Sequence, residues 1–398
     1  MQQKNMWLLP EGIEETLPLQ ALHLEQLRAK LLSTFQCWGY QLVIPPFIDF
    51  LDSLLIGSGH DLDLQTFKLT DQLSGELLGI RADMTPQVAR IDAHHLSHDA
   101  PNRLCYVGTV LHTRGDPLEK SRSPMQIGAE LYGDAGCDSD VEVICLMLEM
   151  LALTGLENVH LDLGHVGIYR ALVEQAQLSP SQESQLFAVL QRKANHELHE
   201  LLLSYRLAPQ LSLSLLTLAQ LNGDKQVLTQ ASALLNTDNA VVSQALNDLR
   251  AIADKLSARF PHLSISFDLA ELRGYHYHTG VVFAAFIPQL GKEIARGGRY
   301  DNIGAAFGRA RPATGFSADL KVLSALSKNH AALHAAPLRI FAPYAPDDVS
   351  LAETVRDLRA QGQIVIAQLA LQTASASDLG CTAQLELHQQ QWLVTALA

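Results

Sequence analysis

The sequence feature that most constrains the fold is the return of strand patterns after a long helical stretch. Residues 178–258 are rich in Leu, Gln, Ala, Ser and Asn, poor in aromatic residues, and apolar mostly at helical spacing. Alternating segments at 103–113 and 123–133 precede this stretch, and strand patterns at 265–269 and 281–286 follow it. We therefore expect an α+β fold with a mixed, largely antiparallel sheet and flanking helices.

The same patterns predict three regions. We expect one core built from residues 1–177 and 259–330, which are separated in sequence by a helical insertion at 178–258. Residues 337–398 form a short C-terminal segment whose pattern predicts a strand, a helix and a strand, followed by two short strands. This segment is therefore expected to be a small α/β unit.

Composition limits the functional classes. Hydrophobic residues make up 47% of the chain, but no run of about 18 apolar residues suggests a membrane span. The N-terminal region carries no basic and then apolar signal pattern. The five cysteines are scattered and form no CxxC pair, which favours reduced thiols in the cytoplasm, and no residue cluster makes a convincing metal site. We predict no cofactor, no bound metal and no membrane partner.

The charge of the chain argues against nucleic acid as a partner. The net charge is −13, whereas a nucleic-acid ligand needs a basic face. Residues 337–398 contain six acidic residues and three arginines, with no lysine. RNA recognition by this segment is not expected.

Two polar residues lie four positions apart on an expected strand. The period of two places Gln126 and Glu130 on one face of residues 123–133. A polar pair that faces a core is destabilising unless it has partners, so this pair favours a pocket. Asp83 and Thr85 precede an expected helix at 86–95, where they would suit either an N-terminal cap or a ligand contact.

Six runs, in this order, resemble the signature motifs of histidyl-tRNA synthetases. They are RADMTP at 81–86, YVGTVLHTR at 106–114, QIGAE at 126–130, LRGYHYHTG at 272–280, GGRYD at 297–301 and GFSADL at 315–320. The combination is more specific than any single glycine pattern. It implies the antiparallel sheet of a class II aminoacyl-tRNA synthetase, with a helical insertion where this chain has its helical stretch.

The resemblance also implies a pocket for the amino acid histidine. Asp83, Thr85 and Gln126 would hold the α-ammonium group, because their oxygens accept N–H bonds. Glu130 and Tyr277 would contact the two imidazole nitrogens.

Arg273 would complete this pocket by pairing with the α-carboxylate in a charge-assisted bond. An alternative is that Arg273 pairs with Glu130 for purely structural reasons. The nearby Tyr277 and Thr279, together with the glycine run, favour the ligand role. His276 and His278 depart from the synthetase pattern, and we assign them no role.

The positions that orient ATP in the synthetases are replaced here. The resemblance matches His112 and Val322 to two arginines that grip the nucleotide, and Pro124 to an aromatic residue that stacks on adenine. A neutral histidine lacks the planar fork with which guanidinium binds phosphate. Adenylyl transfer depends on such positioning and charge neutralisation, so we expect no aminoacylation.

A histidine pocket without the ATP arginines is typical of the regulatory subunits of ATP phosphoribosyltransferase. The opening WLLPEGIEETLP at 7–18 also resembles that family, and the resemblance runs from about residue 7 to about residue 325. It implies a non-catalytic subunit that binds a short catalytic chain, with L-histidine as feedback effector and a two-fold dimer of its own.

Two other functions stay open at this point. A working histidyl-tRNA synthetase would show histidine-dependent exchange of pyrophosphate into ATP. A histidine sensor with a different partner would not retain the short transferase in a pull-down.

Overall fold

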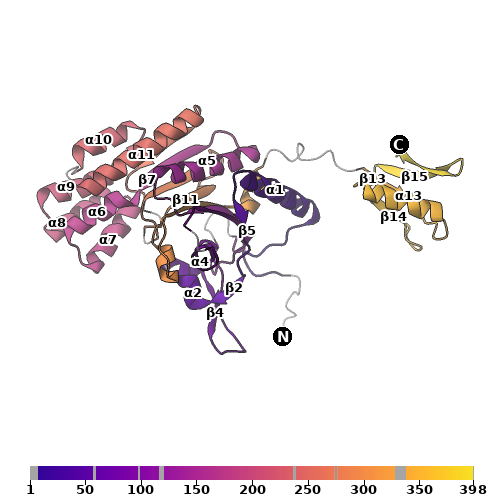
Figure 1. Cartoon of the computed structure of the whole chain (residues 1–398), viewed down its shortest axis with the longest axis horizontal. Helices are drawn as coiled ribbons and strands as arrows, with labels where there is room; N and C mark the ends of the chain where they lie inside the picture. The colour runs from indigo at the N-terminus through magenta and orange to yellow at the C-terminus, as the bar shows by residue number, and fades with distance from the viewer. Residues whose placement is uncertain are drawn as a thin grey trace. The chain divides into compact units, whose positions relative to one another are not determined.

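The computed structural model describes residues 8–56, 60–96, 99–115, 121–235, 239–272, 274–275, 277–327 and 338–397. The chain divides into two compact units, Met1–Lys328 and Asn329–Ala398. A nine-stranded sheet and a three-stranded sheet belong to the first unit, and a four-stranded sheet belongs to the second (Figure 1). Among the described residues, no helix combines the length and the apolar character needed to cross a membrane.

The nine-stranded sheet is mixed and largely antiparallel, as the sequence predicts. Its strands, in spatial order, are β1 (Gln41–Leu42), β5 (Asn102–Thr109), β6 (Met125–Tyr132), β12 (Ala313–Asp319), β11 (Ala295–Arg299), β10 (Val281–Phe286), β7 (His160–His165), β9 (Ser264–Asp268) and β8 (Asn222–Gly223). The β1–β5 and β7–β9 pairs are parallel, and the others are antiparallel. The expected α+β class is confirmed.

One face of this sheet is covered by α1 (Pro18–Cys37), α5 (Cys137–Leu153) and α12 (Leu320–Leu326). Buried side chains of α1, such as Leu27 and Leu31, share an apolar core with Ile127 and Ala129 of β6. Helix α1 ends just before Gly39, where a φ of +85° suits glycine and stops the helix.

The opposite face is covered in part by α4 (Thr85–His95) and the short 3₁₀ helix η1 (Ile303–Phe307). A second, smaller apolar cluster lies here and includes Val88, Leu104, Tyr106 and Tyr300. Polar side chains lie beside this cluster, so this face carries the candidate site.

The helical stretch forms α7 (Pro180–Gln191), α8 (Asn195–Tyr205), α9 (Pro209–Leu218), α10 (Gln226–Leu234) and α11 (Ala240–Arg259), preceded by α6 (Val166–Ala176). Figure 1 shows these helices gathered at one end of the nine-stranded sheet. Helix α11 lies against α5, where Arg259 Nη1 lies 3.3 Å from Cys145 Sγ. The stretch is not wholly helical, because β8 lies within it and pairs with β9. Its separation as an insertion stays a prediction.

The three-stranded sheet consists of β2 (Ile48–Phe50), β4 (Leu77–Ile80) and β3 (Phe67–Thr70), in that order, accompanied by α2 (Leu51–Leu55) and α3 (His60–Gln65). Strands β3 and β4 pair as an antiparallel hairpin. At Gly79 an added Cβ would meet Leu51 and Leu54, so that face of the sheet packs on α2.

The C-terminal unit matches its predicted strand–helix–strand pattern. Strand β13 (Arg339–Ala342) leads into α13 (Val349–Ala360) and the parallel strand β14 (Ile364–Ala367), followed by β15 (Ala383–His388) and β16 (Gln391–Ala396). Helix α13 shares a small core with Ile340 and Leu385. The side chain of Asp348 caps α13 by accepting the Leu351 N–H at 2.9 Å.

Candidate functional site

Strand β6 supplies the floor of the candidate site. Ile127 and Ala129 point into the main core, while the alternate residues Gln126 and Glu130 point toward α4. The two polar side chains therefore share one face, and each meets residues at the start of α4.

Glu130 is a buried carboxyl surrounded by hydroxyl groups. Its side chain is 1% exposed and accepts hydrogen bonds from Tyr106 at 2.9 Å, from Thr85 at 3.1 Å, and from Tyr300. Burial raises the pKa of Glu130 to about 8, with a further rise from the charge of Asp83 that the three hydroxyls partly offset. Near pH 7 the group is thus mostly protonated, and a protonated carboxyl can donate as well as accept hydrogen bonds.

Glycines leave the space that this carboxyl occupies. Gly315 of β12 is the register partner of Glu130, and a Cβ there would lie 1.5 Å from Glu130 Oε2. At Gly128 a Cβ would lie 2.5 Å from the Tyr106 hydroxyl oxygen. A side chain at either position would displace Glu130 or the hydroxyl groups that surround it.

Asp83 and Gln126 form a second polar group beside Glu130. Gln126 Nε2 donates to Asp83 Oδ1 at 2.8 Å, and the Met84 N–H donates to Gln126 Oε1 at 2.9 Å. Asp83 also accepts the Thr85 N–H at 3.1 Å, so it does interact with the start of α4, as a capping role predicts. The Thr85 hydroxyl is instead used by Tyr106 and Glu130.

Aromatic rings line the site beside the carboxyl. The rings of Tyr277 and Tyr300 lie 4.8 Å apart, and the ring of His278 lies 5.3 Å from that of Tyr277. The Tyr277 hydroxyl and His278 Nδ1 are buried without a hydrogen-bond partner among the described residues. Burial lowers the pKa of His278 to about 4, so its ring is neutral at physiological pH. Such unpartnered groups are unusual in a folded protein and suit a polar ligand.

The structure brings five of the six expected histidine-binding residues together. They are Asp83, Thr85, Gln126, Glu130 and Tyr277. Arg273 and His276 lie outside the described residues.

The sequence analysis did not identify Tyr106 and Tyr300 as partners of Glu130. Strand register offered a signal for Tyr106, because it lies directly opposite Gly128, where the absence of a side chain lets its ring lie over the sheet. Tyr300 lies in the GGRYD run and directly follows β11, a strand that the sequence patterns did not predict.

The positions that match the ATP site of the synthetases bond to the chain itself. His112 Nε2 lies 2.9 Å from the Ala82 carbonyl oxygen. Lys321, next to Val322, donates to the Ser123 carbonyl at 2.7 Å. These side chains are thus occupied by backbone groups at the edge of the site.

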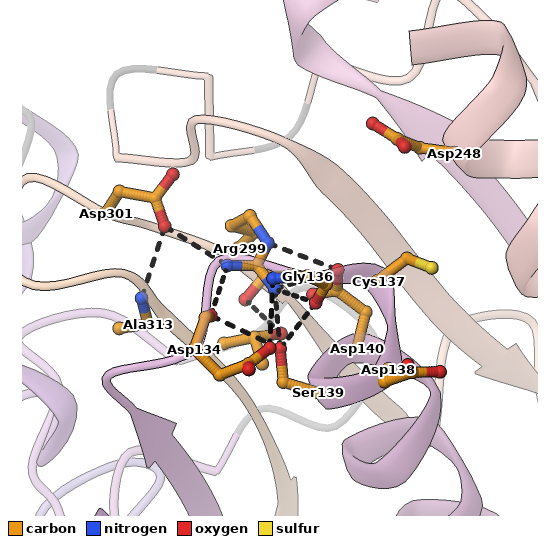
Figure 2. A network of polar contacts seen from close by, with 12 residues as sticks. Asp134, Gly136, Cys137, Asp138, Ser139, Asp140, Asp248, Arg299, Asp301 and Ala313 are labelled. Carbon is orange, nitrogen blue, oxygen red and sulfur yellow. Dashed lines mark hydrogen bonds and ion pairs between the residues drawn. The ribbon is translucent and has the colours of Figure 1, made fainter. Parts of the chain in front are cut away.

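A buried ion pair lies on the GGRYD run, one residue from Tyr300. Arg299 donates to Asp140 from both Nε and Nη2, at 3.1 and 3.0 Å (Figure 2). Arg299 also donates to Asp301 at 3.4 Å, the longest of its hydrogen bonds with the described residues. Burial raises the pKa of Asp140 to about 6, which the charge and hydrogen bonds of Arg299 partly offset.

Family comparisons match both units of the chain. The sequence model of the histidyl-tRNA synthetase family matches residues 12–323. The model of the C-terminal domain of the ATP phosphoribosyltransferase subunit HisZ matches residues 337–395.

Individual relatives agree with these matches. The chain is 55% identical to the ATP phosphoribosyltransferase regulatory subunit of Methylococcus capsulatus over 392 residues, which are 98% of this chain and 96% of the relative. It is also 55% identical to that of Thioalkalivibrio sulfidiphilus over 398 residues, all of both chains.

Solved structures give the same result. A protein of Bacillus halodurans described as an ATP phosphoribosyltransferase regulatory subunit/histidyl-tRNA synthetase superposes with a TM-score of 0.82 at 27% identity, covering 96% of this chain and 97% of the other. The histidyl-tRNA synthetase of Nostoc shares the fold, with a TM-score of 0.75 at 17% identity over 96% of this chain and 92% of the other. The chain therefore belongs to the family of ATP phosphoribosyltransferase regulatory subunits, built on the fold of the histidyl-tRNA synthetases.

Proposed function

We propose that this chain has no complete active site and senses L-histidine for a short catalytic ATP phosphoribosyltransferase chain that lacks its own regulatory domain. The complex would condense ATP with phosphoribosyl pyrophosphate in histidine biosynthesis, and bound histidine would inhibit it. A coupling of about 1–3 kcal/mol between the two sites is enough for such control.

The observation that carries the proposal is the buried Glu130 carboxyl beside the unpartnered Tyr277 hydroxyl. A neutral imidazole offers one N–H donor and one lone pair. A carboxyl with a pKa of about 8 and a phenol can meet both, because each can donate and accept. Asp83 and Gln126 supply oxygens suited to an ammonium group nearby. Arg273 is proposed to bind the carboxylate.

The lack of catalysis is supported by the groups at the nucleotide positions. His112 and Val322 stand where the resemblance places the two arginines, and neither has the forked guanidinium that would grip a phosphate. His112 also lies at hydrogen-bond distance from a backbone carbonyl, and Lys321, the neighbour of Val322, donates to another.

Self-association is supported by an apolar sheet face. Opposite α2, the three-stranded sheet carries a group of apolar side chains that we call the β2–β4–β3 face: Ile48, Phe50, Phe67, Leu69, Leu78 and Ile80. Ile48 and Phe50 are 44% and 51% exposed. Contiguous exposed apolar surface marks interaction sites, and a two-fold dimer would bury it against its own copy.

The test is the rate at which a short catalytic subunit condenses ATP with phosphoribosyl pyrophosphate. We expect the rate to rise when this chain is added and to fall again as histidine is titrated. A Glu130→Ala chain should still activate but should resist histidine, because it lacks the polar side chain that meets the imidazole.

Two results would favour the other functions. Histidine-dependent ATP–pyrophosphate exchange by this chain alone would make it a synthetase. Failure to retain the short transferase in a pull-down, combined with histidine binding, would make it a sensor for a different partner.

A further inference from the structure

Three consecutive residues at the end of β11 have side chains that bond in three directions. Tyr300 donates to Glu130 inside the candidate site. Arg299 bonds to the turn that precedes α5 and to the first turn of that helix, and Asp301 bonds to Thr279. We call residues 299–301 the β11 junction.

All three nitrogen atoms of the Arg299 guanidinium donate to the start of α5 or to the turn before it. Arg299 donates to the backbone carbonyls of Asp134 and Gly136, each at 3.0 Å, and to the Ser139 hydroxyl at 2.8 Å, in addition to its two bonds with Asp140 (Figure 2). Its side chain is 9% exposed and that of Asp140 is 5% exposed. Buried, multiply bonded arginine of this kind fixes geometry strongly.

Asp301 joins the same junction to the segment that carries Tyr277. Thr279 Oγ1 donates to Asp301 Oδ2 at 2.9 Å, and the Asp301 N–H donates back to Thr279 Oγ1 at 3.0 Å. Asp301 Oδ1 also accepts the Ala313 N–H at 3.2 Å, at the start of β12. Both the carboxyl side and the tyrosine side of the site are thus tied to the β11 junction.

The start of α5 in turn contacts the helical stretch. Lys255 of α11 donates to Asp138 and lies 3.4 Å from Cys137 Sγ. Beside this contact lies a small hollow whose lining includes Asp140, Ile252 and Arg299. Asp140 Oδ1 is buried there without a hydrogen-bond partner among the described residues.

We propose that the β11 junction couples the histidine site to α5 and α11, so that a ligand at Glu130 changes the position of these helices through the Arg299–Asp140 pair. The inference rests on the proposed function and names the route by which its effector acts. A ligand that bonds Glu130 competes with Tyr300 for the carboxyl oxygens. Arg299 and Tyr300 are consecutive in the chain, so a shift of the backbone at Tyr300 also shifts the backbone at Arg299.

A purely structural role for the ion pair predicts a different outcome. Buried ion pairs contribute little net stability, and removal of one partner acts on the whole fold. Coupling instead predicts that removal of the ion pair stops the effect of histidine on α5 and α11, while histidine still binds.

The test is amide hydrogen exchange of the full chain, with and without histidine, in the wild type and in Asp140→Asn. In the wild type we expect histidine to slow exchange in β6 and also in residues 134–141 and α11. In Asp140→Asn we expect the slowing in β6 to persist, with histidine affinity within about twofold, while the slowing in residues 134–141 and α11 falls at least about tenfold. Histidine inhibition of the complex should weaken in parallel.

Helix α5 offers a matched control in Glu142→Gln. Arg103 donates to Glu142 from Nε at 2.7 Å and from Nη2 at 2.8 Å, a similar pair on the same helix that does not contact the β11 junction. This variant should respond to histidine like the wild type. The coupling is overturned if Asp140→Asn is folded and histidine still slows amide exchange at residues 134–141 as much as in the wild type. It is also overturned if Asp140→Asn loses affinity for histidine to the same extent as it loses the slowing. If histidine slows exchange nowhere in the wild type, the histidine site itself is wrong.

Discussion

Glu130 illustrates how much of the site a single residue could predict. The period of two placed it on the same face as Gln126, and the structure finds both side chains there. The three hydroxyls around it come from α4, β5 and the end of β11. Contacts of that kind depend on strand order, which no local pattern contains.

Glu130 also predicts how stability depends on pH. Its folded-state pKa of about 8 lies above the ordinary value of 4.5. The folded chain therefore holds this proton more tightly, and the associated stability is present below about pH 4.5 and lost as the pH rises to about 8.

In Glu130→Gln this dependence should disappear. Between pH 5 and pH 8 the free energy of unfolding of the wild type should fall relative to the variant, by on the order of a few kcal/mol. Urea denaturation of both chains at the two pH values measures it. Equal slopes in wild type and Glu130→Gln would show that the carboxyl is not held protonated.

Arg273 gives a prediction for the effector. Arg273→Ala should abolish histidine inhibition while leaving assembly with the catalytic subunit intact, because only the proposed carboxylate contact is removed. Inhibition assays and co-purification measure the two properties. Unchanged inhibition would mean that the pocket is misplaced.

At the scale of elements, most helices and strands follow from periodicity, but β11 does not. Its sequence ARGGR has neither alternation nor β-branched residues, and it forms a strand because β10 and β12 pair with it on both sides. Adjacent glycines suit backbone that either turns or lies close to a neighbour, and Gly297-Gly298 shows the close approach: a Cβ at Gly298 would lie 2.7 Å from the Val281 carbonyl oxygen. Strand β1 is short and ends at Leu42, ahead of Pro45 and Pro46.

Strand β12 gives a prediction at this scale. Gly315→Ala should destabilise the chain by about 1–3 kcal/mol and abolish histidine binding, because the new methyl group overlaps Glu130. Calorimetric titration with histidine measures the binding. Ser317→Ala is the control, because it also introduces an alanine on this face of β12, two residues from Gly315. This variant should bind histidine like the wild type. If Gly315→Ala binds histidine with wild-type affinity, binding does not depend on the present position of Glu130 and the hydroxyl groups around it.

At the scale of the whole molecule, sequence alone indicated self-association only through family resemblance. The β2–β4–β3 face adds a surface on which a prediction can be made. Phe50→Lys should shift the chain from dimer to monomer, because a charge would be buried in an apolar interface. Sedimentation equilibrium measures the mass. Leu73, at the tip of the β3–β4 turn and 97% exposed, provides the control: Leu73→Lys should remain dimeric.

The bonds of His112 and Lys321 to the backbone have an evolutionary consequence. An arginine restored at position 112 would leave the Ala82 carbonyl without its present neighbour, and the Lys321 ammonium would still be engaged with Ser123. Reversion would thus need several compensating changes before any nucleotide chemistry returned. If the chain is the sensor proposed above, a change to an enzyme that uses a nucleotide therefore requires several substitutions and not one.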